Sequence, residues 1–227
     1  MTTLITGASI IGCHTARLLA ERGEAVELMD LRPARDAIAS ITQHPLVSVV
    51  EGDVTDFEAL LARVRERGVR RIVHTAALRY AAVIGAWSGP GTSVPSKVLT
   101  SLLVPARRGE TAVMDDPYAV WKGGDEFIDA RDCALANVAA LDATAPTQGV
   151  YFIGLGRHAS FDEFVAAVRA LHPALQVRLA VEPGGGFAGF PHVRSAASDI
   201  SAAARELGWT PAYSLADSVR HFAPLLG

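Results

Sequence analysis

The sequence predicts an α/β protein built on a doubly wound parallel sheet. Apolar runs alternate with amphipathic helical segments from the first residues onward, and the chain opens with a strand, a glycine turn, a helix and a second strand. Strands that alternate with helices form parallel sheets with right-handed crossovers. Half of the 227 residues are apolar, which is enough to bury a full core as one domain or one and a half.

The opening segment carries the clearest chemistry. A strand over residues 2–6 runs into Gly7 and a turn of small residues, a helix follows and stops at Gly23, and a strand over residues 25–29 ends in Asp30. The free N–H groups and the positive dipole end of such a helix suit a dinucleotide pyrophosphate. Asp30 stands where a carboxylate can accept hydrogen bonds from the ribose hydroxyls of an adenosine.

This segment resembles the extended short-chain dehydrogenase/reductase family, also called the NAD-dependent epimerase/dehydratase family. Its turn usually reads Thr-Gly-x-x-Gly-x-x-Gly. Here Gly7 and Gly12 match the outer glycines, but the segment between them is one residue short, and Ser9, Ile10 and Ile11 stand where the middle glycine is expected. A Cβ at that position projects toward the phosphates. The resemblance implies that these five residues contact the cofactor.

The third strand, over residues 46–54, extends the resemblance. It ends in Gly52-Asp53-Val54, which is similar to the family's Gly-Asp-Val/Leu, where the acid bonds the adenine amino group and the next backbone lines the ring. A helix over residues 56–67 follows. We expect cofactor contacts from Asp53 and Val54, because ligands collect at the carboxyl ends of parallel strands. The alternative is that Asp53 is a turn acid or a helix cap.

The fourth strand, over residues 69–74, closes on His74-Thr75-Ala76-Ala77. This resembles the family's His-x-Ala-Ala, whose small residues let the backbone pass close to the ribose and pyrophosphate. Thr75, Ala76 and Ala77 are therefore expected cofactor contacts as well. The alternative is that the two alanines are merely small.

The family pattern breaks after Leu78. The family continues with a helix, a strand ending in Ser or Thr, and a helix carrying Tyr-x-x-x-Lys. Here a strand over residues 79–85 follows at once and resembles the family's later Leu-Arg-x-x-x-Val-x-Gly. At roughly 30 residues per βαβ unit, the missing piece is on the order of 60–90 residues. Either the deletion is real, or a segment is missing from the sequence as written.

Residues 118–122 have the literal Tyr-x-x-x-Lys spacing. On a helix, Tyr118 and Lys122 would share one face, and the ammonium could lower the pKa of the phenol. Pro117 before the segment and Gly123 and Gly124 after it favour a strand or loop instead. We therefore assign no catalytic residue.

The C-terminal part also alternates helices and strands. We expect helices over residues 94–108 (interrupted or ended near Pro105), from an Asp132 cap, from a Ser160 capping box to about residue 171, and over 198–207 and 214–222. Expected strands cover residues 111–114, 149–154 and 176–180. Residues 126–134 resemble the family's Phe-Ile-x-Val-x-Asp-Val-Ala, and residues 199–211 its closing Leu-Gly-Trp-x-Pro segment.

Composition excludes several classes of partner. A net charge of −3 gives no general attraction to nucleic acid or anionic lipid, and the basic residues between 63 and 71 suit the solvated end of a helix. No apolar run reaches membrane length, and a strand starting at residue 2 leaves no room for a secretory leader. Cys13 and Cys133 lack metal-ligand spacing. We expect a cytoplasmic protein with no metal site.

The resemblance implies a Rossmann-type dinucleotide-binding part over residues 1–85, truncated after residue 78, and a C-terminal part over 86–227 that includes a small α/β substrate lobe. The expected protein binds NAD and, if a central catalytic segment is present, is an oxidoreductase or epimerase acting on a nucleotide sugar or a similar alcohol or carbonyl. Asp30 favours NAD because a carboxylate repels a 2′-phosphate, whereas Arg32 leaves NADP open.

The alternative is a non-redox protein on the same scaffold, such as a dinucleotide sensor or a recruited hydrolase. The expected partner is a small-molecule substrate, and the resemblance leaves a homodimer open.

Overall fold

The computed structural model describes residues 1–74, 78–90, 92–193 and 196–226. Its first sheet has four parallel strands in the order β3-β2-β1-β4, which confirms the predicted parallel sheet. The elements of this part are β1 (Thr2–Thr6), α1 (Ile10–Glu21), β2 (Ala25–Asp30), α2 (Arg35–Ala39), β3 (Val47–Glu51), α3 (Phe57–Glu66) and β4 (Val69–Val73).

Among the described residues, the later strands form three small sheets and do not pair with the first one. β5 (Leu78–Tyr80) pairs in parallel with β9 (Tyr151–Ile153), and β7 (Ala112–Met114) pairs in parallel with β11 (Val177–Leu179). β6 (Ala82–Ile84), β8 (Asp125–Asp129) and β10 (His158–Ala159) form the third sheet. The single strand predicted over residues 79–85 is therefore wrong. The strand is interrupted at Ala81, whose N–H donates to the carbonyl of Ile153. β5 before it and β6 after it therefore pair with different strands.

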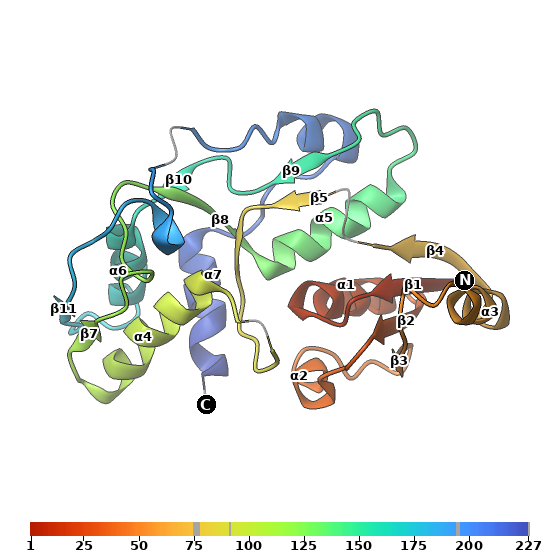
Figure 1. Ribbon diagram of the computed structural model, residues 1–227, viewed down its shortest axis with the longest axis horizontal. Coiled ribbons are helices and arrows are strands. Elements are labelled where there is room, and N and C mark those ends of the chain that lie inside the picture. The colour runs from red at the N-terminus through yellow and green to blue at the C-terminus, as the bar shows by residue number, and fades with distance from the viewer. Residues whose placement is uncertain (75–77, 91, 194–195, 227) are drawn as a thin grey trace.

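The C-terminal helices are α4 (Val94–Arg108), α5 (Ala130–Asp142), α6 (Phe161–Arg169) and α7 (Leu215–Phe222), with shorter helical turns at Phe187–Gly189, Ala203–Leu207 and Ala223–Leu225. Figure 1 shows the four-stranded sheet with α1, α2 and α3 at one end of the molecule and α4, α6, β7 and β11 at the other. α5 lies between them and packs along α1.

Three predicted helix boundaries differ from the structure. α4 continues through Pro105 and ends at Gly109, whose φ of 70° is left-handed; a proline removes only one hydrogen bond, so the last turn survives it. Asp129, not Asp132, caps α5 by accepting from the N–H of Arg131 at 2.8 Å. The helix expected from residue 198 begins at Ser201, because the Asp199 carboxylate accepts from the Ser201 N–H at 2.9 Å.

The other capping prediction is confirmed. Ser160 and Glu163 form a reciprocal capping box at the start of α6, and Ser214 and Asp217 form a second one at α7. Asp132 has a different task from the one predicted. Its buried carboxylate accepts the N–H groups of Ala212 and Tyr213 at 2.8 and 3.1 Å, and so fixes the segment that leads into α7.

A short chain of hydrogen bonds joins the two parts of the molecule. The Tyr80 phenol donates to Asn137 Oδ1 at 2.7 Å, Asn137 Nδ2 donates to Thr15 Oγ1 at 2.9 Å, and Thr15 Oγ1 donates to the Ile11 carbonyl at 2.8 Å. At the far end of α5, Asp142 pairs with Arg22 at 2.8 Å. The first helix is thus bonded to α5 by side chains as well as packed against it.

Candidate functional site

The turn between β1 and α1 has a backbone shape that requires glycine at two positions. Gly7 has a φ of 103°, in the left-handed region, and its N–H donates to the Met29 carbonyl at 2.7 Å. A Cβ added at Gly12 would collide with the Gly7 carbonyl oxygen. The two glycines that match the family's outer positions are therefore the ones that let the helix pack closely onto the turn.

The N-terminus of α1 is open. Ser9 is the N-cap residue and is exposed, yet its side chain makes no capping hydrogen bond, and the first turn contains no acidic residue. The first helical hydrogen bond runs from the Cys13 N–H to the Ser9 carbonyl at 2.9 Å. Within the described ranges, the N–H groups of residues 10–12 have no hydrogen-bond acceptor. Such amides can donate to an anion and are aided by the helix dipole.

The two isoleucines at this corner are packed into the protein. The Ile10 side chain reaches Gly85, where an added Cβ would collide with its Cδ1. Ile11 packs against the buried cluster that includes Leu78, Ile128 and Cys133. Because each side chain has an apolar neighbour below the turn, the missing middle glycine does not leave two exposed isoleucines over the helix end.

Asp30 is held in a defined position beside this helix end. One carboxylate oxygen accepts from the Ala8 N–H at 2.9 Å and the other from the Arg32 N–H at 2.9 Å. Each oxygen keeps a further lone pair for a ligand hydroxyl. Arg32 contributes its backbone to this arrangement and is itself exposed. Gly52 lies next to Asp30, since the Gly52 N–H donates to the Asp30 carbonyl at 3.0 Å.

Asp53 forms a turn with its own neighbour. One carboxylate oxygen accepts both the N–H and the hydroxyl of Thr55 at 2.8 and 2.7 Å, and these bonds lower the pKa of Asp53. The helix cap of α3 is Asp56, which accepts from the Ala59 N–H at 3.0 Å. Val54 is exposed. The structure therefore has the turn arrangement that the sequence offered as an alternative, and the adenine contact stays a prediction.

The remaining predicted cofactor contacts, Thr75, Ala76 and Ala77, lie outside the described residues. The expectation that residues 118–122 are not helical is confirmed. Tyr118 lies in a turn and is 58% exposed, and Lys122 is exposed in a bend. The Tyr80 phenol is partly buried and lies close to α5, and burial raises its pKa far above the ordinary value. It serves as a hydrogen-bond donor to Asn137.

Sequence reasoning missed two buried polar residues near this region. Asn137 is buried on α5, and no local signal revealed its partners Tyr80 and Thr15. Glu126 is fully buried and accepts the N–H groups of Gly156 and Ser198, both at 2.8 Å, so that it ties two loops to β8. Cys13 is buried, and burial raises its pKa to about 12, which agrees with a packing role.

In the described part of the chain, no group of three or more His, Cys, Asp or Glu side chains is placed to hold a metal ion. Nor does any helix there have the length and apolar character needed to cross a membrane.

Comparisons with known proteins agree with this architecture. Residues 3–83 match the model of the NAD dependent epimerase/dehydratase family. No curated protein sequence is similar enough to match the chain. A UDP-glucose-4-epimerase from Stenotrophomonas maltophila, crystallised with NAD and formylated UDP-arabinopyranose, is 19% identical with a TM-score of 0.74, over 99% of this chain and 97% of that one.

Two further solved structures are similar. UDP-glucose 4-epimerase from Bifidobacterium longum, in complex with NAD+ and UDP, is 19% identical with a TM-score of 0.72, over 99% of this chain and 98% of that one. Epimerase Mth375 from Methanothermobacter thermautotrophicus is 14% identical with a TM-score of 0.73, over 99% and 91%. Residues 3–83 are thus similar in sequence to the NAD dependent epimerase/dehydratase family, and the whole chain shares the Rossmann-type fold of these solved epimerases.

Proposed function

We propose that the chain binds NAD across the N-terminus of α1 and that its substrate class is a nucleotide sugar. The observation that carries the proposal is the open helix end above the glycine turn, with the Asp30 carboxylate fixed 2.9 Å from the Ala8 N–H. The similar epimerases that were crystallised with NAD and with UDP or a UDP-sugar support both halves of the proposal.

The residues present fit the cofactor at both of its polar ends. The N–H groups of residues 10–12 can donate to the pyrophosphate, and the helix dipole adds to this attraction. The second lone pairs of Asp30 can accept from the adenosine ribose hydroxyls. We assign Gly7, Ser9, Ile10, Ile11 and Gly12 to the pyrophosphate side.

The same carboxylate favours NAD over NADP, because it would repel a 2′-phosphate. We further assign Asp53, Val54, Thr75, Ala76 and Ala77 to the adenosine side, as contacts still to be tested.

When bound, NAD would supply the hydride acceptor for oxidation of a sugar hydroxyl. We assign no residue of this chain to the accompanying proton transfer, because Tyr118 and Lys122 do not share a helix face and the partly buried Tyr80 hydroxyl already donates to Asn137. The proposal for this chain therefore rests on binding, and turnover is a separate measurement.

Titration of the purified chain with NAD and with NADP tests the cofactor assignment. We expect saturable binding of NAD that is tighter than that of NADP. Asp30→Ala should weaken NAD binding by about tenfold or more, the value of one or two hydrogen bonds to a charged group. Asp115→Ala is the matched control, because Asp115 is an exposed acid far along the chain from α1. Absence of saturable binding, or equal loss in both variants, contradicts the proposal.

A second titration, with UDP-glucose in the presence of NAD, tests the substrate class and turnover together. Binding of UDP-glucose with appearance of reduced nicotinamide or of an epimer supports an enzyme of the epimerase/dehydratase type. Binding of NAD with neither signal supports the non-redox alternative. An intact mass near the calculated 23.9 kDa would establish that the central segment is truly absent. Sedimentation equilibrium would test the homodimer, which stays a prediction.

A further inference from the structure

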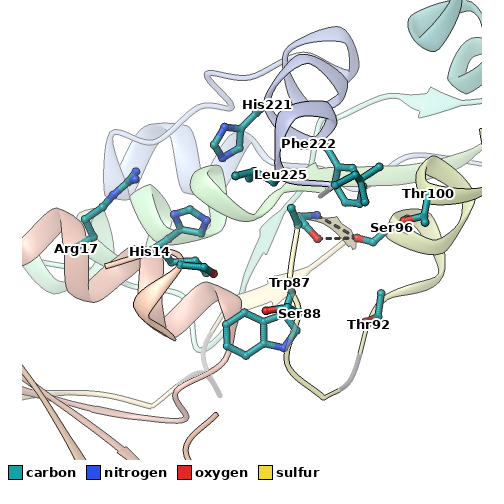
Figure 2. Close-up of a pocket in the computed structure, with 15 residues that line it drawn as sticks. His14, Arg17, Trp87, Ser88, Thr92, Ser96, Thr100, His221, Phe222 and Leu225 are labelled. Atoms are coloured by element: carbon teal, nitrogen blue, oxygen red, sulfur yellow. Dashed lines mark hydrogen bonds between the residues drawn. The ribbon is translucent and has the colours of Figure 1, made fainter. Parts of the chain in front are cut away.

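A cavity of about 330 Å³ lies beside the middle of α1, beyond the turns that meet the cofactor in the proposal above. Its walls come from α1, the end of α2, the segment that follows β6, the first turns of α4 and the end of α7 (Figure 2). None of the contacts that the sequence predicted falls here. Three basic side chains line it, namely His14, Arg17 and His221.

The basic end of the cavity holds donors without partners. His14 is only 5% exposed, and its Nδ1 has no hydrogen-bond partner in the part of the chain that the structure describes. Arg17 Nε is likewise enclosed and has no hydrogen bond, and its ion pair with Glu21 is long, at 3.6 Å. The His14 and His221 rings lie 6.4 Å apart between centroids. Figure 2 shows the three side chains converging from α1 and α7.

The opposite end of the cavity is already satisfied. Ser96 Oγ donates to the Gly85 carbonyl at 3.0 Å and accepts from the Gly85 N–H at 3.2 Å, while Thr100 donates to the Ser96 carbonyl at 2.9 Å. Phe222 and Leu225 supply an apolar wall. The unmet hydrogen-bonding capacity is therefore concentrated at the basic end. Buried polar groups usually find partners, so an enclosed nitrogen without one points to a ligand.

Arg17 supplies the positive charge at this end of the cavity. The carboxylate of Asp129 on β8 acts on both histidines, and Arg131 at the start of α5 engages it through two side-chain hydrogen bonds of 2.8 and 2.7 Å. Burial and then Arg17 lower the pKa of His14 to about 4, and burial and then Arg131 lower that of His221. Both groups would gain protons more easily if an anion entered.

We propose that this cavity binds a phosphorylated small molecule of sugar-phosphate size, with the phosphate held by Arg17, His14 and His221. The guanidinium fork matches phosphate geometry and gives strong charge-assisted hydrogen bonds. The volume is at the lower end of the range for small-molecule sites, which suits a monosaccharide phosphate better than a dinucleotide. The satisfied hydroxyls of Ser96 and Thr100 face the remainder of the ligand.

Proton uptake should accompany binding. The groups that face His14 and His221 are Arg17 on α1, Asp129 on β8 and Arg131 on α5. An anion at this end would raise both histidine pKa values, so binding strengthens as the pH falls. Sulfate is a useful probe because its charge does not change over this range. We expect its affinity to rise about tenfold between pH 7 and pH 5.

The test is calorimetric titration of the full chain with glucose 1-phosphate, inorganic phosphate, sulfate and acetate, each with and without saturating NAD. We expect saturable binding of glucose 1-phosphate, weaker binding of inorganic phosphate, and none of acetate. Arg17→Gln should weaken glucose 1-phosphate binding by about tenfold or more. Arg65→Gln removes the same charge from an exposed position on α3 and should leave this affinity unchanged.

Several outcomes would overturn the proposal. These are absence of saturable phosphate binding, equal weakening in both arginine variants, tighter binding of acetate than of phosphate, and complete competition by NAD. His221→Gln provides a second variant on another element and should reduce the pH dependence of sulfate binding. NAD titration of the Arg17→Gln variant separates this proposal from the previous one, because its NAD affinity should match that of the unchanged chain.

Discussion

The two parts of this molecule are built differently around one shared helix contact. The amino-terminal part is a single ladder of four parallel strands, whereas the carboxyl-terminal part divides its strands among three small sheets. The first core is mainly aliphatic, with Ile5, Leu19 and Leu28 fully buried. The second core combines aliphatic residues with an aromatic cluster around Trp121. Strand pairing in a continuous parallel sheet organises the amino-terminal part, and side-chain packing organises the carboxyl-terminal part.

The aromatic core shows how far packing replaces strand pairing. The Trp121 ring lies 5.0 to 5.7 Å from four phenylalanine rings, those of Phe127, Phe161, Phe164 and Phe187. Most of these contacts are edge-to-face, the arrangement that aromatic quadrupoles favour. A defect in this cluster should therefore cost more than the loss of any one strand-end contact.

The largest effect is expected from Phe164→Ala. Phe164 is fully buried and contacts both Trp121 and Phe127, so the variant should lose about 3–5 kcal/mol of unfolding free energy. Urea denaturation measures the loss, and Phe190→Ala, at a ring that is 59% exposed, is the control. Because α1 packs on α5, both parts should unfold together. Two separate transitions would show that the amino-terminal and carboxyl-terminal parts unfold independently.

Gly12→Ala tests the packing of the glycine turn in the amino-terminal part. The new Cβ would meet the Gly7 carbonyl, which is backbone and cannot rotate away, so we expect a loss of about 1–3 kcal/mol together with weaker NAD binding. Gly149→Ala is the matched control, since an added Cβ there meets nothing within 4 Å. Equal stability of the two variants would contradict the close packing described for the turn.

Asn137→Ala tests the bond between the two parts. The variant leaves the Tyr80 hydroxyl without its acceptor and removes the donor to the Thr15 hydroxyl, and we expect a loss of about 1–3 kcal/mol in urea denaturation. Tyr80→Phe removes one of the bonds and should cost less. If the double variant is no worse than Asn137→Ala alone, the hydroxyl acts only through Asn137; additive losses would argue against the chain of bonds.

The smallest effect concerns the decline of fold stability at acidic pH. Glu206 accepts the Tyr151 hydroxyl at 2.5 Å and the Thr147 N–H at 2.8 Å, and these bonds lower its pKa from 4.5 to about 2. A carboxylate whose pKa is lowered by folding stabilises the fold at pH values above its unfolded-state pKa. This contribution is lost as the pH falls from 4.5 toward 2. Glu206→Gln should flatten that decline in thermal melts. An unchanged slope would contradict the assignment.

The amino-terminal fold could be predicted because its signals are local. Alternating apolar runs, the glycine stops and the acid after β2 lie within the first 73 residues, and each predicted strand is found there. The predictions failed where partners are distant in the chain. Nothing local shows that Ala81 divides a strand, since β5 and β6 are separated by their pairing with β9 and β8. Asp132 likewise has its partners about 80 residues away.

The candidate sites also contain features that local sequence predicts and features that depend on residues distant in the chain. The sequence predicted the glycine turn and the position of Asp30, because both follow from one βαβ unit. It did not predict the cavity at Arg17 and His221, since α1 and α7 are brought together only by the whole fold. Asn137 could have been suspected as a polar residue on an apolar helix face, but its two partners could not.

The seam between α1 and α5 has a consequence for how the chain tolerates a cut. α5 is bonded to the amino-terminal part at its middle by Asn137 and at its end by Asp142, so we expect these bonds and the helix packing to hold the two parts together without covalent continuity between β4 and β5. A polypeptide nicked in that connection should stay associated through this seam, and two separately produced fragments should reassemble into one folded particle.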